Sequence, residues 1–371
     1  MYFLIKLNIA IWLLPSVLFL TSVQASDRFD EIWSHGKLYE NPDSGGLQSF
    51  VLSGRLQADL THFEADQGEF KDLLWRRFRF GFKADFANDW RIHLEMDFNL
   101  NEDLEDVYER WTDAYIGWAF SKDGYLKVLK QSAGFTLDGY TSSKNLLTPE
   151  RNNLTNNLWF VAEYFTGVSV SGLCSEGLHC KAGVFSSDGD EEISDFSAGY
   201  FSLLSAGYDF GSRLNQDKLE LLASHVYNDA HEDANTRPFR HVFSLMTKWE
   251  NGPWGIWADA TAGRGYGEQS DVLGLVVMPF YYMTPKTQWV FRYTWLSSEG
   301  DNGIRFGRYE REIESGRGNE YRELFAGFNW FYYGHKLKWQ TGLQFTNMDD
   351  DANDGGEYDG WGVTTSLRIS W

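Results

Sequence analysis

Hydrophobic and polar residues alternate along much of the chain, most clearly over residues 358–371. From Trp361 onward the odd positions are mostly apolar, and the even positions hold glycine, serine, threonine or arginine. A period of two is typical of a β-strand with one apolar and one polar face. Trp371 adds an aromatic residue to the apolar face, as expected for the aromatic girdle at a membrane interface.

Similar alternating segments recur from about residue 50. A strand in lipid must have its backbone paired on both sides, which requires a closed barrel. We count about sixteen segments, joined in turn by short turns and long polar loops, which is the pattern of outer-membrane barrels. The sequence therefore predicts an all-β fold, a transmembrane antiparallel β-barrel of about 16 strands. Its short turns face the periplasm, its long loops face outward, and its lumen holds water.

The long connections are acidic, for example residues 64–74, 99–110 and 188–192. The third, residues 136–157, has about twenty residues, and loops of that length are commonly functional. We expect it to fold into the lumen as a constriction loop.

The N-terminus has an early lysine, an apolar run and a small-residue end at Ala25. This pattern predicts a signal peptide over residues 1–25, with an N-terminal membrane helix as the alternative. Residues 26–48 are then a periplasmic lead-in, and residues 49–371 form the barrel.

Composition agrees with this organisation. Among 371 residues, aromatic side chains make up 17%, glycines number 36 and the net charge is -20, which favours a barrel with acidic outer loops over a soluble enzyme. Cys174 and Cys180 flank a turn in an exported chain, and we expect a disulfide. Only His179 lies nearby as a further metal ligand, so we expect no metal site. We expect no cofactor either.

Basic residues facing the lumen are the candidate site. Arg77, Arg79 and Lys83 share one strand face, and Arg91 lies on the next strand, which makes the densest inward positive field. Lumen charge, rather than net charge, sets ion selectivity. We interpret these residues as an anion track; the alternative is that they form a wall network of ion pairs with Asp85, Glu95 and Asp97.

Three segments, SGRLQAD (53–59), WRRFR (75–79) and TSSKNLLTPER (141–151), resemble the phosphate-selective porin O/P family. The resemblance runs along nearly the whole mature chain. It implies a homotrimeric sixteen-stranded channel in the bacterial outer membrane, narrowed by the third loop. It also implies that basic residues guide phosphate or related anions, for which the candidates are Arg77, Arg79, Lys83, Arg91, Lys130, Lys144 and Arg151.

Two features depart from the family pattern. Ser132 stands where the family usually has a lysine before the third loop, and no ladder of alternating arginines is evident. The identity of the solute therefore stays open.

The leading hypothesis is passive diffusion of small polar solutes, mainly anions, with outer-membrane lipid and lipopolysaccharide as surroundings and no nucleic-acid partner. A non-selective or weakly cation-preferring porin is the first alternative.

A barrel enzyme is the second alternative, and it would need a nucleophile beside a base. Ser224 and His225 are sequence neighbours that point to opposite strand faces, and there is no Gly-x-Ser-x-Gly motif. A structural or adhesin barrel is the third alternative.

Overall fold

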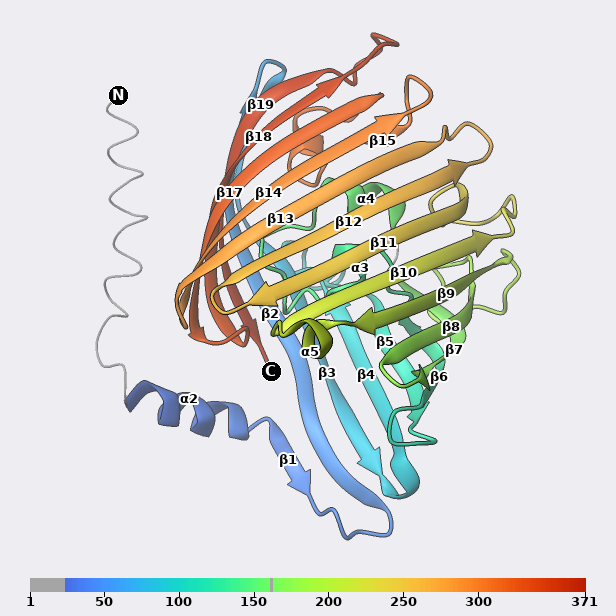
Figure 1. The fold of residues 1–371 in the computed structure, drawn as a ribbon, viewed down its shortest axis with the longest axis vertical. Helices are drawn as coiled ribbons and strands as arrows, with labels where there is room; N and C mark the ends of the chain where they lie inside the picture. The colour runs from blue at the N-terminus through green and yellow to red at the C-terminus, as the bar shows by residue number, and fades with distance from the viewer. Residues whose placement is uncertain (1–23, 161–162) are drawn as a thin grey trace.

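A computed structural model of the protein describes residues 24–160 and 163–371. Within these ranges sixteen strands form a closed antiparallel barrel, which confirms the predicted fold class (Figure 1). The ring closes where β19 (Tyr358–Ser370) pairs with β2 (Leu47–Ala65). The strands between them are β3 (Gly68–Phe86), β4 (Trp90–Phe98), β5 (Tyr108–Trp118), β6 (Tyr125–Ser132), β7 (Tyr164–Ser175), β8 (Leu178–Ser186), β9 (Tyr200–Asp209), β10 (Lys218–Asn228), β11 (Phe239–Asn251), β12 (Trp254–Gly265), β13 (Val272–Thr284), β14 (Thr287–Ser298), β17 (Glu320–Tyr333) and β18 (Leu337–Asp349).

The segment before the barrel contains helix α2 (Gln24–Ser34) and strand β1 (Lys37–Glu40), which pairs with the start of β2. Trp33 attaches this segment to the barrel because its Nε1 donates a hydrogen bond to the Ser370 carbonyl at 2.6 Å. The predicted signal peptide, apart from its last two residues, lies outside the described residues. No helix in the described ranges is long and apolar enough to cross a membrane.

The two ends of the barrel differ in the length of their connections. At one end, here called the short-turn end, the connections include the 3-10 turn η1 (Ala87–Asp89) and helix α5 (Gly211–Leu214). Asn88 and Asp89 both have positive φ in this three-residue connection, which lets Phe86 pair with Trp90 across a tight reversal of the chain. The opposite end, the long-loop end, carries eight loops. L2 is residues 99–107, L4 is residues 187–199 and L7 is residues 299–319.

The prediction of an acidic loop over residues 64–74 is wrong. β2 continues to Ala65, which pairs with Gly68 of β3, so only two residues form the turn. β3 meets β4 only from Phe78 onward. Its preceding residues therefore project beyond β4, where water reaches both faces of the hairpin. The inside–outside alternation that marks a strand is lost there.

The third loop, L3 (residues 133–160), folds into the lumen as predicted, and its helices α3 (Leu137–Tyr140) and α4 (Asn153–Leu158) lie within the ring of strands in Figure 1. L3 packs against inward apolar residues of β9 to β14. Phe160 is the link, with its ring 5.3 Å from Phe135 of L3 and 5.1 Å from Phe201 of β9. On this side of the lumen, L3 and the strands thus form a hydrophobic core. Its strand members include Leu203, Leu222, Val226, Val242, Met246, Val276, Met278, Val290 and Leu296.

Two inward glycines make room for the leucines of α4. A Cβ on Gly263 of β12 would lie 2.5 Å from Leu158 Cδ2, and a Cβ on Gly274 of β13 would lie 2.9 Å from Leu154 Cδ1. Any larger residue would push L3 away from the wall.

Inward polar side chains hold the rest of L3. Asp259 of β12 accepts a hydrogen bond from the Leu137 N–H at 2.7 Å. Basic and amide side chains of four further strands donate to backbone carbonyls of L3. These donors are Arg292, Asn329, Lys338 and Arg368. Three of the inward cations therefore position the loop instead of facing open water.

Candidate functional site

A bulge in β3 brings two consecutive arginines to the lumen. Gln57 of β2 pairs with Arg77, but the next residue, Ala58, pairs with Trp75, so Arg76 has no partner on β2. Such an extra residue interrupts the alternation of faces. Arg76 and Arg77 consequently line the same cavity at the long-loop end of the barrel.

The two arginines have different partners. The Arg76 guanidinium pairs with both carboxylate oxygens of Glu150 in L3, with Nη2 at 2.8 Å from Oε2. Arg77 donates from Nη1 to the Gln57 side chain at 2.9 Å. No carboxylate oxygen of the described residues lies within 4.0 Å of Arg77. Arg77 therefore presents a positive charge that no fixed carboxylate neutralises directly.

Arg79 and Arg91 fit the alternative interpretation of a wall network. Arg79 is 2% exposed, with Nη2 at 3.0 Å from Asp97 Oδ2, and its Nη1 donates to the Tyr164 hydroxyl at 2.6 Å. Arg91 Nε lies 2.5 Å from Asp85 Oδ1. The structure therefore separates the predicted track into paired members and the unpaired Arg77.

Arg151 of L3 faces the same region as Arg79. Its Nε donates to the Asp138 carbonyl at 3.0 Å, and its guanidinium lies 4.9 Å from the centre of the Trp159 ring. Glu163, just before β7, lies between the two arginines. Burial opposes its charge, but the guanidinium groups of Arg151 and Arg79 hold the pKa of Glu163 down to about 2.

The cavity has a volume of about 510 Å³. It is lined by five arginines and three carboxylates, so its lining carries net positive charge. Arg308 enters it from L7, and the nearby Arg76 guanidinium, together with burial, lowers the pKa of Arg308. The lining residues are Trp75, Arg76, Arg77, Arg79, Asp97, Phe98, Asn99, Asn101, Glu109, Arg110, Glu163 and Arg308.

Lys83 and Lys144 do not line this cavity. Lys83 is on β3, on the same strand face as Asp85 two positions later. Lys144 is in L3, where its Nζ donates to the Trp371 carbonyl at 3.0 Å. Burial and then the Arg55 guanidinium lower the pKa of Lys144 to about 8, and Lys83 adds to the effect. This second set of cations is therefore separate from the arginines around the cavity.

Lys130 has a different environment. Its side chain is fully buried, and Nζ donates to the Glu191 carbonyl at 2.7 Å and lies 3.4 Å from Glu192 Oε2. Glu192 also accepts a hydrogen bond from the Trp111 N–H at 2.8 Å. Lys130 thus holds L4 over β5 and is not brought together with Arg77.

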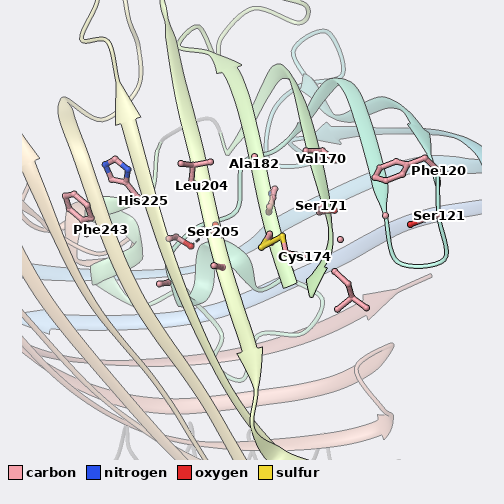
Figure 2. Close-up of a pocket in the computed structure, with 18 residues that line it drawn as sticks. Phe120, Ser121, Val170, Ser171, Cys174, Ala182, Leu204, Ser205, His225 and Phe243 are labelled. Atoms are coloured by element: carbon pink, nitrogen blue, oxygen red, sulfur yellow. Dashed lines mark hydrogen bonds between the residues drawn. A yellow bond between two sulfur atoms is a disulfide. The ribbon is translucent and has the colours of Figure 1, made fainter. Parts of the chain in front are cut away.

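The two cysteines form a disulfide at the short-turn end of β7 and β8. They border an apolar cavity of about 610 Å³, shown in Figure 2. Ser224 and His225, the pair weighed for an enzyme, are not joined here. The Ser224 hydroxyl shares a 2.9 Å hydrogen bond with Ser205, whereas the His225 ring stacks on Phe243 at 4.4 Å.

Sequence reasoning missed Arg76, Arg308 and Glu163. Two consecutive polar residues at Arg76 and Arg77 are the mark of the bulge in the sequence, but the loop predicted over residues 64–74 hides the strand that precedes them. Arg308 and Glu163 belong to loops, whose path through the lumen depends on contacts with distant strands.

The sequence profile of the family described as phosphate-selective porin O and P matches residues 50–359. No curated protein sequence matches the chain. Among solved structures, the anion-selective porin from Comamonas acidovorans is similar, with a TM-score of 0.63 and 12% identity over 87% of this chain and 99% of that one.

Two other solved structures are similar in fold. The loop L8 deletion mutant of OmpT, an outer membrane protein of Vibrio cholerae, has a TM-score of 0.59 and 14% identity, over 88% of this chain and 100% of that one. OprB of Pseudomonas putida has a TM-score of 0.63 and 10% identity, over 87% of this chain and 94% of that one. The family and the fold indicate a channel rather than an enzyme. The chain belongs to the phosphate-selective porin O and P family and is an outer-membrane porin.

Proposed function

We propose that this porin conducts small hydrophilic solutes by passive diffusion and prefers anions, in particular phosphate and related oxyanions. The solute exchanges part of its hydration for contacts with arginine side chains and leaves because each contact is weak. A planar guanidinium suits this task because it binds an oxyanion through two parallel N–H donors.

The observation that carries the proposal is Arg77 in the cavity at the long-loop end. It has no carboxylate partner within 4.0 Å in the described part of the chain, and the cavity lining as a whole is positive. The description of the family as phosphate-selective and the anion selectivity of the Comamonas porin also support an anion preference. The ion pairs at Arg79 and Arg91 favour weak rather than strict selectivity.

The candidate anion path of this proposal comprises Arg77 and Arg79 at the cavity, with Arg151 beside it. It also includes the second set of cations, Lys83 and Lys144, and the ion-paired Arg91. Lys130 acts on the path only through its hold on L4. We further propose that the chain assembles as a homotrimer within outer-membrane lipid and lipopolysaccharide; the trimer form of Vibrio cholerae OmpT supports the trimer.

Recording in planar bilayers under a potassium chloride gradient tests the proposal. The sign of the reversal potential reports anion or cation preference, and phosphate added to the bath should reduce chloride current by binding in the pore. A cation-directed reversal potential without phosphate block would instead support a general porin, and an absence of conductance would support a structural barrel.

A further inference from the structure

Glu163 lies at the centre of an arginine pair that would suit a solute anion. One of its carboxylate oxygens, Oε2, is 3.8 Å from Arg79 Nη2, and the other, Oε1, is 3.6 Å from Arg151 Nη1. Both distances allow electrostatic attraction but exceed those of charge-assisted hydrogen bonds, about 2.7–2.9 Å. The Glu163 side chain is 23% exposed, whereas those of Arg79 and Arg151 are almost fully buried. The carboxylate is therefore the accessible member of the three.

The two arginines keep donors that no protein atom satisfies. Arg79 Nε and Arg151 Nη1 are both buried and have no hydrogen-bond partner in the described structure. Buried donors without acceptors cost about 1–3 kcal/mol each, so two arginines that each keep one open donor and lie beside the same carboxylate favour a further acceptor. Glu163 neutralises the arginines electrostatically but does not reach these two N–H groups.

Other contacts fix the arginines in this arrangement. Asp97 and Tyr164 hold Arg79, and the Asp138 carbonyl and the Trp159 ring hold Arg151. The guanidinium groups therefore stay in place when Glu163 moves. The Glu163 carboxylate accepts no hydrogen bond from the residues that the structure describes, and Glu163 directly precedes the first residue of β7.

We propose that Glu163 is a specificity-determining residue whose carboxylate occupies an oxyanion position between Arg79 and Arg151, so that a permeating oxyanion binds there by displacing it. This inference rests on the anion preference proposed above. An oxyanion offers several acceptor oxygens and reaches the open donors of both arginines. A chloride ion offers a single sphere of charge and competes less well with the tethered carboxylate.

The test compares phosphate block of chloride current through the wild-type porin, Glu163→Gln and Glu109→Gln. Glu109 carries the same charge on the lining of the same cavity but forms no ion pair with Arg79 or Arg151. Glu109→Gln therefore measures what the loss of one negative charge does in general. The quantity measured is the phosphate concentration that halves the chloride current at fixed voltage and salt.

We expect Glu163→Gln to lower the half-blocking phosphate concentration about tenfold, since one competing charge-assisted interaction is removed. Glu109→Gln should lower it no more than about twofold, as for an exposed charge. Equal effects of the two variants would overturn the displacement model and leave only a general charge effect.

A second variant guards against misfolding. Glu163→Asp keeps the charge on a shorter side chain, so its half-blocking concentration should lie between those of the wild type and Glu163→Gln. Heat-dependent migration of the barrel on gels must be the same for all proteins. If the wild-type porin itself is cation-selective and unaffected by phosphate, the proposed function fails. If phosphate blocks the wild-type porin and the Glu163 variants have the same half-blocking phosphate concentration as the wild type, this inference alone fails.

Discussion

Arg76 and Glu150 join the bulge of β3 to L3 across the lumen, through a guanidinium that contacts both carboxylate oxygens. The two side chains are 12% and 16% exposed, so the pair is largely shielded from water. It lies beside Arg77 and Arg308, which share the cavity lining with Arg76. A bulge in the wall thus determines where the constriction loop meets the cavity.

Replacing Glu150 with glutamine should destabilise the barrel. Arg76 would keep its charge next to Arg77 and Arg308 without a carboxylate, and the loss of one partner from a buried pair costs about 3 kcal/mol. Urea unfolding of the protein in lipid vesicles measures this loss. Glu69→Gln, an exposed change on the same hairpin, should stay within about 0.5 kcal/mol of wild type. Similar midpoints for both variants would contradict the prediction.

Arg77 should contribute more to selectivity than Arg91. Arg77 lines the cavity and has no carboxylate within 4.0 Å in the described structure, whereas the Arg91 side chain lies outside the cavity lining and is 40% exposed, so water and salt screen its charge more strongly. Arg77→Gln should therefore shift the reversal potential toward cations, and Arg91→Gln should shift it less. Charge reversal at Arg77 and Arg79 together should give the largest shift. An unchanged reversal potential in the double variant would remove both residues from the path.

Anion preference should weaken as pH rises through about 8. Burial and the Arg55 guanidinium lower the pKa of Lys144 to about 8, so Lys144 is charged below that pH and neutral above it. Reversal potentials recorded from pH 6 to pH 10 should change mostly between about pH 7 and 9. Lys144→Gln should make this step smaller, because one of the titrating cations is lost. A step of unchanged size in the variant would show that another group causes it.

Asp259 should be essential for the position of L3. Its carboxylate accepts hydrogen bonds from the Leu137 N–H, the Ser244 hydroxyl and the Thr261 hydroxyl. Asp259→Ala leaves these three buried donors without that acceptor and should lower the free energy of unfolding by about 3 kcal/mol. Open-channel current noise should also rise because L3 is less restrained. Ser244→Ala, which removes a single donor, should have the smaller effect on both measurements.

The strand pattern predicted the ring of strands because lipid requires an apolar residue at every second position. In β19, for example, burial alternates from residue to residue between Trp361 and Ser370. Residues that face the lumen do not follow such a regular polar pattern, so the sequence indicates less about their contacts. Val242 and Met246 face inward but are as apolar as the outward Phe243 and Leu245, so their sequence gives no sign that they pack against L3.

The candidate site was predictable only in part. Arg77 and Arg79 follow from strand register, and the length of the third loop indicated that it enters the lumen. The pairing of Arg76 with Glu150 depends on a bulge, and the place of Glu163 depends on contacts between β3 and the far end of L3. Such contacts join residues more than seventy positions apart, as Arg76 and Glu150 do. Local sequence carries no record of them.

The hydrophobic core that L3 forms with β9 to β14 also has an electrical consequence. Ions do not enter that apolar core, so the permeation path that we propose runs beside the cations of β3, β4 and L3. Low-dielectric walls concentrate field lines into a narrowed path, where each fixed charge has more influence on a passing ion than it would in an open bore. A porin with few unpaired cations can thereby discriminate between ions of opposite sign.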